Sequence, residues 1–126
     1  MTSAQDKQRA AELVEWVVEA MEEAGTMTSR AMMGGHTLYC EGVIFGIVAK
    51  GQIWFKSDAD TDHEWDAAGC ETFTYEREGK TATMNYRLAP DDVYDYPEEL
   101  RRWAELGLVA GRRAAARKTP RKKKES

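Results

Sequence analysis

Short apolar segments separated by glycine-containing breaks fill the stretch from Ser29 to Lys56, SRAMMGGHTLYCEGVIFGIVAKGQIWFK. β-branched and aromatic residues bounded by such breaks indicate successive strands of an antiparallel meander. Glycine suits the breaks because hairpin turns need positive φ, which costs free energy in a residue with a Cβ. The pattern predicts strands over 30–33, 36–40, 43–49 and 52–56, with breaks at Gly34-Gly35, Glu41-Gly42 and Lys50-Gly51.

A second hairpin is predicted further along the chain. Residues 71–77 and 81–88 flank Glu78-Gly79-Lys80, and Phe73, Tyr75, Met84 and Tyr86 alternate with polar residues. This alternation predicts that one face of the hairpin is buried and the other is exposed to solvent.

Between the meander and the hairpin, residues 62–68 form a predicted short helix. Its N-cap is Asp60 or Thr61, and Gly69 ends it.

Two longer helices are predicted near the ends of the chain. The first covers 6–24, is opened by Ser3 and stopped by Gly25, and carries an apolar stripe that suits packing on the sheet or binding a partner. The last begins around Asp95-Tyr96-Pro97 and should fray over 111–118. Its inner face is small and apolar, which predicts close approach to another element: Leu100, Trp103, Ala104, Gly107, Leu108 and Gly111. The predicted fold is α+β, two-layered, with a single antiparallel sheet of about five strands packed by N- and C-terminal helices.

Length and composition limit the classes of protein that fit. A chain of 126 residues with 42% hydrophobic and 32% charged residues is typical of one soluble domain. No apolar run approaches the roughly 18 residues of a membrane span. The N-terminus lacks the apolar core of a signal peptide, so we expect a cytoplasmic protein. Cys40 and Cys70 are too few for a disulfide framework, and we expect both to be reduced and buried.

Charge divides the chain into two unlike parts. Residues 112–126 carry eight Lys or Arg and one acid, a charge of +7, whereas residues 1–111 carry ten bases and 21 acids, a charge of −11. We therefore predict a folded domain over 1–111 and a basic, disordered tail over 112–126. The cations that could contact nucleic acid or an acidic partner are Arg112, Arg113, Arg117, Lys118, Arg121, Lys122, Lys123 and Lys124. A solubilising extension with no specific role is the third interpretation.

The sequence contains no recognisable catalytic or metal-binding motif. The acids between Asp58 and Asp66 resemble a calcium loop, but His63 and Gly69 stand where such a loop needs glycine and a bidentate glutamate. His36 and Cys40 would lie on one face of a strand about 13 Å apart, too far for a shared metal or a nucleophile–base pair. A Cys70–His63 pair lacks any group to orient it, and His63 is better explained as a solvated residue. We expect no catalytic residue, no cofactor and no metal.

Aromatic residues on the predicted strands have two interpretations. They could form a stacking surface for single-stranded nucleic acid. However, these strands carry acids and the body of the domain is strongly negative, which repels phosphates, so we expect packing within the sheet and core to account for most of the aromatic residues. An uncovered face would be covered by a protein partner or a second copy. The residues are Tyr39, Phe45, Trp54, Phe55, Phe73, Tyr75 and Tyr86.

Several motifs together resemble the N-terminal domain of the TfoX/Sxy family over about residues 6–110. They are Arg30-x-Met-x-Gly-Gly-x-x-Leu-Tyr39, Gly42-x-x-Phe-Gly-Ile-Val48, Trp54-Phe-Lys56, Ala67-Ala-Gly69 leading to Phe73-Thr-Tyr75, and Met84-x-Tyr86 before Pro90. The final helix with Leu100 and Trp103 also fits. The motif residues, which we interpret as structural, are Arg30, Met32, Gly34, Gly35, Leu38, Tyr39, Gly42, Phe45, Met84 and Tyr86.

The resemblance implies an α+β fold and a regulatory, non-catalytic role. Named members of the family regulate natural competence genes and are thought to help a transcription activator at its promoters. They usually carry a second, C-terminal domain, and in its place we expect this chain to have only the short basic tail. We therefore expect an adaptor that contacts a protein or itself and touches nucleic acid through its tail. The alternative is a small enzyme or ligand-binding domain with a pocket between sheet and helices.

Overall fold

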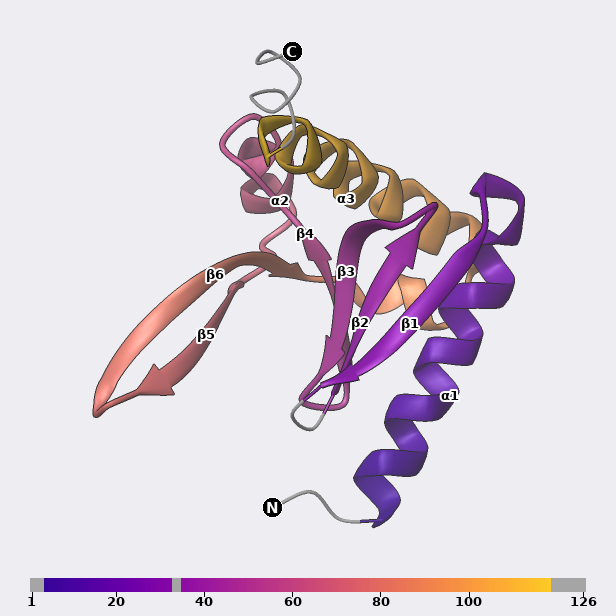
Figure 1. Ribbon diagram of the computed structural model, residues 1–126, viewed down its shortest axis with the longest axis horizontal. Coiled ribbons are helices and arrows are strands. Elements are labelled where there is room, and N and C mark those ends of the chain that lie inside the picture. The colour runs from indigo at the N-terminus through magenta and orange to yellow at the C-terminus, as the bar shows by residue number, and fades with distance from the viewer. Residues whose placement is uncertain (1–3, 33–34, 119–126) are drawn as a thin grey trace, which may run out of the picture.

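The computed structural model describes residues 4–32 and 35–118. It contains one sheet with helices packed on one of its faces (Figure 1). The first helix, α1 (Ala4–Met21), is followed by a 3₁₀ turn, η1 (Glu22–Ala24). The strands are β1 (Met27–Met32), β2 (Gly35–Cys40), β3 (Val43–Ala49), β4 (Gln52–Lys56), β5 (Thr72–Arg77) and β6 (Lys80–Leu88). The remaining helices are α2 (Asp62–Ala67), η2 (Asp91–Tyr94) and α3 (Pro97–Lys118).

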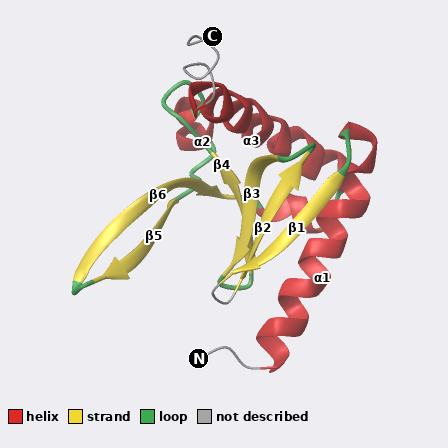
Figure 2. Cartoon of the chain, viewed as in Figure 1, coloured by secondary structure: helices red, strands yellow, loops and turns green. Residues whose placement is uncertain are grey.

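The sheet is antiparallel throughout, in the order β1-β2-β3-β4-β6-β5. The α+β prediction is therefore confirmed, with six strands rather than about five. Figure 2 shows α1 and α3 against the β1–β4 part of the sheet, while the β5–β6 hairpin extends away from it. In the part of the chain that the structure describes, no helix is long and apolar enough to cross a membrane.

The tight turns of the sheet follow the sequence prediction. Glu41, Lys50 and Glu78 have φ values of 52°, 56° and 52°, and the glycine after each of them also has positive φ. Two consecutive residues with positive φ define a turn whose twist matches that of the flanking strands. These Glu-Gly and Lys-Gly pairs therefore fix three of the hairpin connections.

The beginning of the sheet differs from the prediction. The first strand is Met27–Met32, not 30–33, because the polar residues before Arg30 pair with β2 at an exposed edge. Gly35 is the first residue of β2 rather than part of a turn. A Cβ there would lie 2.2 Å from the carbonyl oxygen of Val48, so the site has no room for one. Gly34, Met33 and Ser3 lie outside the described residues.

The main core lies between the sheet and the two long helices. It contains completely buried side chains from each layer, including Val17 of α1, Phe45 and Phe55 of the sheet and Leu100 of α3. The indole N–H of Trp16 donates to the carbonyl oxygen of Val93 at 2.8 Å, and the Tyr94 hydroxyl accepts from the N–H of Ile53 at 2.8 Å. These bonds join η2 to both α1 and β4, and they close the end of the core.

A second, smaller cluster lies on the sheet face away from the long helices. Trp54, Phe73, Tyr86 and Ile47 are buried there, and the Trp54 and Phe73 rings meet edge to face at 4.8 Å between centroids. The predicted buried face of the second hairpin is thus found at its base. It is incomplete even there, since Met84 opposite Phe73 is 38% exposed, and it does not extend to the tip, where residues 76–81 are exposed.

The ends of the helices correct three predictions. The first helix changes to a 3₁₀ turn at Glu22 before Gly25. The short helix begins after Thr61, but the Thr61 side chain makes no capping bond, and Asp58 accepts the Thr61 N–H instead at 3.1 Å. The last helix does not fray at Gly111 and continues to Lys118, so the domain boundary predicted at residue 111 falls inside α3. Residues 119–126 of the predicted tail lie outside the described residues.

Candidate functional site

The C-terminal half of α3 is held directly against β3. A Cβ on Gly107 would lie 2.5 Å from the carbonyl oxygen of Phe45, and one on Gly111 would lie 2.2 Å from that of Ile44. Both positions therefore require glycine so that the helix and strand backbones can touch. The small residues of the inner face of α3 predicted close approach to another element. This prediction is confirmed, and the element is β3.

An ion pair at the end of α3 connects it to the loop before α2. Arg113 donates from Nε to Asp58 Oδ2 at 2.8 Å and from Nη2 to Asp58 Oδ1 at 3.1 Å. The hydrogen bond from Arg113 is the main reason that the pKa of Asp58 lies below its ordinary value, and the same bond raises the pKa of Arg113. Arg113 is thus a structural anchor of the helix end as well as a surface cation.

The other cations predicted to contact nucleic acid lie along the same end of α3. Arg112 and Arg117 are exposed on its last two turns, and Lys118 is its final residue. Arg121, Lys122, Lys123 and Lys124 lie outside the described residues. Arg112, Arg113 and Arg117 therefore lie on the last turns of α3.

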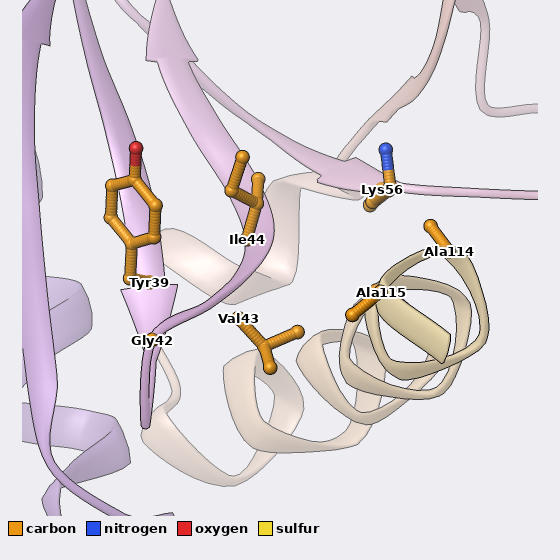
Figure 3. Close-up of a pocket in the computed structure, with 8 residues that line it drawn as sticks. Tyr39, Gly42, Val43, Ile44, Lys56, Ala114 and Ala115 are labelled. Carbon is orange, nitrogen blue, oxygen red and sulfur yellow. The ribbon is translucent and has the colours of Figure 1, made fainter. Parts of the chain in front are cut away.

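A hollow lies between the end of the sheet and the last turns of α3 (Figure 3). Its volume is about 280 Å³, and its lining consists mostly of apolar atoms from three strands and the helix. Tyr39 and Lys56 stand on opposite sides of it with Ile44 between them, and Ala114 and Ala115 form the helix side (Figure 3).

A second hollow adjoins the first on the β1 side. It has a volume of about 310 Å³, is lined by Thr28, Ser29, Arg30, Tyr39 and Gly42, and shares Tyr39 and Gly42 with the first. We call the two together the Tyr39 groove. Its lining residues are Thr28, Ser29, Arg30, Tyr39, Gly42, Val43, Ile44, Lys56, Gly111, Ala114 and Ala115.

The groove was not predicted from the sequence because residues from five elements, far apart in the chain, form it. One local signal was available: Lys56 follows Trp54 at a spacing of two, which places both on the same face of β4. The Nζ atom of Lys56 lies 5.0 Å from the centroid of the Tyr86 ring, so this cation rests on the aromatic face of the sheet.

The acidic loop around α2 is organised by arginines. Arg87, which is buried, reaches Asp66 at 2.9 Å and Asp62 at 3.2 Å, and it also donates to the carbonyl oxygen of Cys70 at 2.8 Å. Together with the Asp58–Arg113 pair, these contacts explain the clustered acids without a metal. Among the described residues, no group of three or more His, Cys, Asp or Glu side chains could hold a metal ion.

Both cysteines are free and buried, as predicted. Burial raises the pKa of the Cys40 thiol and that of the Cys70 thiol, which disfavours the nucleophilic thiolate. His63 is exposed and lies 3.8 Å from Glu64, in agreement with a solvated residue. The arrangement therefore provides no activated nucleophile at either cysteine.

The aromatic residues divide between the two faces of the sheet. Phe45 and Phe55 belong to the main core, whereas Trp54, Phe73 and Tyr86 are buried in the second cluster. These five cannot stack on bases, as the packing interpretation predicted. Tyr39 and Tyr75 are half-buried and retain accessible surface.

The motif residues occupy several kinds of position. Leu38, Phe45, Gly35 and Tyr86 are buried, and Gly42 forms a turn. Arg30, Met32 and Met84 are exposed, so packing does not explain their presence in the motif. Gly34 is outside the described residues. The exposed Arg30 and the half-buried Tyr39 both line the Tyr39 groove.

Comparison with known proteins agrees with this architecture. The model of the TfoX N-terminal domain family matches residues 19–110. A relative, the DNA transformation protein TfoX1 of Aliivibrio fischeri (strain ATCC 700601 / ES114), is 29% identical over 66 residues. The matched region covers 52% of this chain and 32% of the relative, so the chain matches about a third of that protein's length. Since the family model spans most of the fold, the chain belongs to the TfoX N-terminal domain family.

Proposed function

We propose that this chain is a non-catalytic regulatory adaptor with a competence-related role. Its folded domain contacts another protein or a second copy, and the cations at its C-terminal end contact nucleic acid. Membership of the TfoX N-terminal domain family supports a regulatory role, as does a relative named for DNA transformation. The buried cysteines with raised thiol pKa values favour a role without covalent catalysis.

The observation that carries the proposal is the grouping of cations at the end of α3. Backbone contact at Gly107 and Gly111 holds the helix on β3, so Arg112 and Arg117 are exposed on its last turns beside Arg113, whose guanidinium is paired with Asp58. The helix then leads into Arg121, Lys122, Lys123 and Lys124 of the sequence. Cations grouped in this way bind phosphates by releasing counterions, largely independently of base sequence.

Fluorescence anisotropy with labelled duplex DNA across a salt series tests this contact. The full chain should bind with a log–log salt slope of about −3 to −6. A full-length variant with glutamine at positions 121–124 should bind more weakly to every sequence and show a shallower slope. The variant Arg77→Gln with Lys80→Gln on the β5–β6 hairpin removes two cations elsewhere, and its charge-matched counterpart is Lys123→Gln with Lys124→Gln. A strong sequence preference that survives the C-terminal substitutions would refute this form of the proposal.

Substitution is preferable to truncation after residue 111. Such a truncation would remove the last seven residues of α3 together with Arg113, the partner of Asp58. Weaker binding would then report damage to the fold as well as loss of cations. Keeping α3 intact separates the two effects.

The proposed protein contact uses the free edge of the sheet. β1 is an edge strand, and every residue after its first is exposed. Such an edge can accept a further strand from a partner. Light scattering after size-exclusion chromatography would give the mass in solution, and Ser29→Lys should reduce any self-association because a charge at an edge opposes pairing. An unchanged dimer in this variant would exclude β1 as the contact.

A ligand-binding domain is the second candidate, and the hollow beside Tyr39 is the observation that favours it. Cysteine substitutions discriminate an enzymatic form of this candidate. An activity abolished by Cys40→Ala or Cys70→Ala in a stably folded variant would support an enzyme. The adaptor proposal expects no such activity.

A further inference from the structure

Acidic residues are almost absent from the strands of the sheet. Glu76 is the sole acidic residue within the six strands, and it accepts a bond from Thr81 on the β5–β6 hairpin. The other acids of residues 1–111 lie on helices, turns and loops. The sheet is therefore the positive part of an otherwise acidic domain, and the expectation that the strands carry acids that repel phosphates is wrong for all of them except β5.

Strand register brings the groove side chains to one sheet face. Tyr39 lies opposite Thr28, Arg30 opposite Thr37, and Lys56 opposite Tyr86. Opposed residues of antiparallel strands point to the same face. The Tyr39 groove thus has a phenol ring between two cations, Arg30 on one side and Lys56 on the other.

The acids that adjoin the groove in sequence are already engaged. Glu41 precedes Gly42, and its carboxylate accepts the backbone N–H of Thr26 at 2.6 Å. Asp58 follows Lys56 by two residues and is bound by Arg113 through both of its oxygens. These contacts reduce the repulsion that a phosphate would meet at this end of the sheet.

We propose that the Tyr39 groove binds single-stranded nucleic acid, with one base on the Tyr39 ring and the flanking phosphates on Arg30 and Lys56. The base would occupy the hollow of about 280 Å³ between the Tyr39 ring and Ala114 and Ala115. Stacking requires an unpaired base, which a duplex does not offer. The inference deepens the nucleic-acid contact of the proposed function, because the groove opens beside the basic end of α3.

Shape and charge favour this ligand over an acidic peptide. A peptide carboxylate would use the two cations but would gain little from an apolar slot beside a phenol ring. A nucleotide has both a π face for the ring and a phosphate for each cation. The half-buried Tyr39 therefore distinguishes the two ligands experimentally.

The test measures binding of a fluorescein-labelled oligothymidylate of about 20 nucleotides, long enough to span a groove of this kind. The full chain is compared with Tyr39→Ala, Tyr39→Phe, Lys56→Gln and Arg30→Gln, and with Lys80→Gln on the hairpin tip as a charge-matched control. Thermal unfolding confirms that each variant is folded. An oligouridylate and a duplex of equal length are measured in parallel, and they separate RNA from DNA and stacking from charge.

The expected pattern is specific to stacking. Tyr39→Ala weakens single-strand binding at least about fivefold and leaves duplex binding unchanged, whereas Tyr39→Phe retains the affinity because the ring remains. Lys56→Gln and Arg30→Gln each weaken single-strand binding more than Lys80→Gln does, and each makes the salt slope shallower.

Three results would overturn the proposal. If the groove variants bind as the parent does while glutamine at 121–124 abolishes binding, the groove is not a site and the proposed function stands. If the parent binds neither single strands nor duplex, both proposals fail. If a polyglutamate peptide binds more tightly than the oligonucleotides and Tyr39→Ala does not affect it, the groove is a site for acidic peptides.

Discussion

The guanidinium of Arg113 holds both carboxylate oxygens of Asp58, at 2.8 and 3.1 Å, across 55 residues of sequence. Asp58 is the less exposed partner, since 14% of its side chain is accessible against 38% for Arg113. The same carboxylate also accepts the N–H of Thr61 at 3.1 Å. One side chain thus fixes the end of α3 and the start of α2.

Removing this carboxylate should destabilise the fold. Asp58→Ala loses bonds to both Arg113 and Thr61, and we expect a loss of about 2 kcal/mol in the free energy of unfolding. A double-mutant cycle with Arg113→Gln, measured by urea denaturation, should give a larger coupling energy than a cycle on the exposed Glu99–Arg102 pair. Equal coupling energies in the two cycles would show that the bidentate geometry of the Asp58–Arg113 pair does not increase stability.

The pair also predicts a dependence of stability on pH. Arg113 lowers the pKa of Asp58 from its ordinary value of 3.8, so the ionised form is favoured in the folded state. The contribution of Asp58 is complete above that ordinary pKa and is lost as pH falls through the lower folded-state pKa. The stability difference between the parent and Asp58→Asn should therefore be constant near neutrality and shrink in acid. A difference that does not change down to the acid limit of folding would contradict this assignment.

Replacing Arg87 by lysine should destabilise the fold. Its buried guanidinium serves Asp62, Asp66 and the carbonyl oxygen of Cys70 at once. An ammonium group cannot reach three separated acceptors with the same planar geometry. Arg87→Lys should cost about 2 kcal/mol in unfolding free energy, measured by denaturant titration. Arg102→Lys, on an exposed ion pair, is the control and should cost close to nothing.

Local sequence patterns were sufficient to predict much of the fold. Glu41-Gly42, Lys50-Gly51 and Glu78-Gly79 need positive φ, and each pair sets a turn within a few residues of chain. The small inner face of α3 likewise predicted its contact with another element, which Gly107 and Gly111 confirm. Periodicity and turn chemistry are local properties, so one sequence shows them.

The parts of the fold that could not be predicted depend on contacts between residues far apart in the sequence. β4 pairs with β6 rather than with β5, and nothing local to Trp54 or Leu88 indicates their opposition. α3 continues beyond Gly111 with Arg113 bound to Asp58, a partner that the helix sequence does not contain. The Tyr39 groove depends on the same kind of contact, because β1, β2, β3, β4 and α3 each contribute part of its lining.

Gly111→Ala should destabilise the protein although alanine is the better helix former. In an exposed helix the change would gain up to about 1 kcal/mol. Here the new Cβ would meet the Ile44 carbonyl oxygen at 2.2 Å and Val43 Cγ1 at 3.1 Å, so α3 must move off β3. Because the clash is with backbone, we expect a net loss of about 2 kcal/mol, as for other overpacked sites. Arg112→Ala, next to Gly111 on the exposed side of α3, is the stability control and should change the unfolding free energy by less than about 0.5 kcal/mol.

The displacement of α3 in Gly111→Ala should also open the Tyr39 groove, because Gly111 lines it. Gly111→Ala should therefore weaken oligothymidylate binding under conditions where it remains folded. A Gly111→Ala protein as stable as the parent would show that the contact between α3 and β3 is looser than the distances imply.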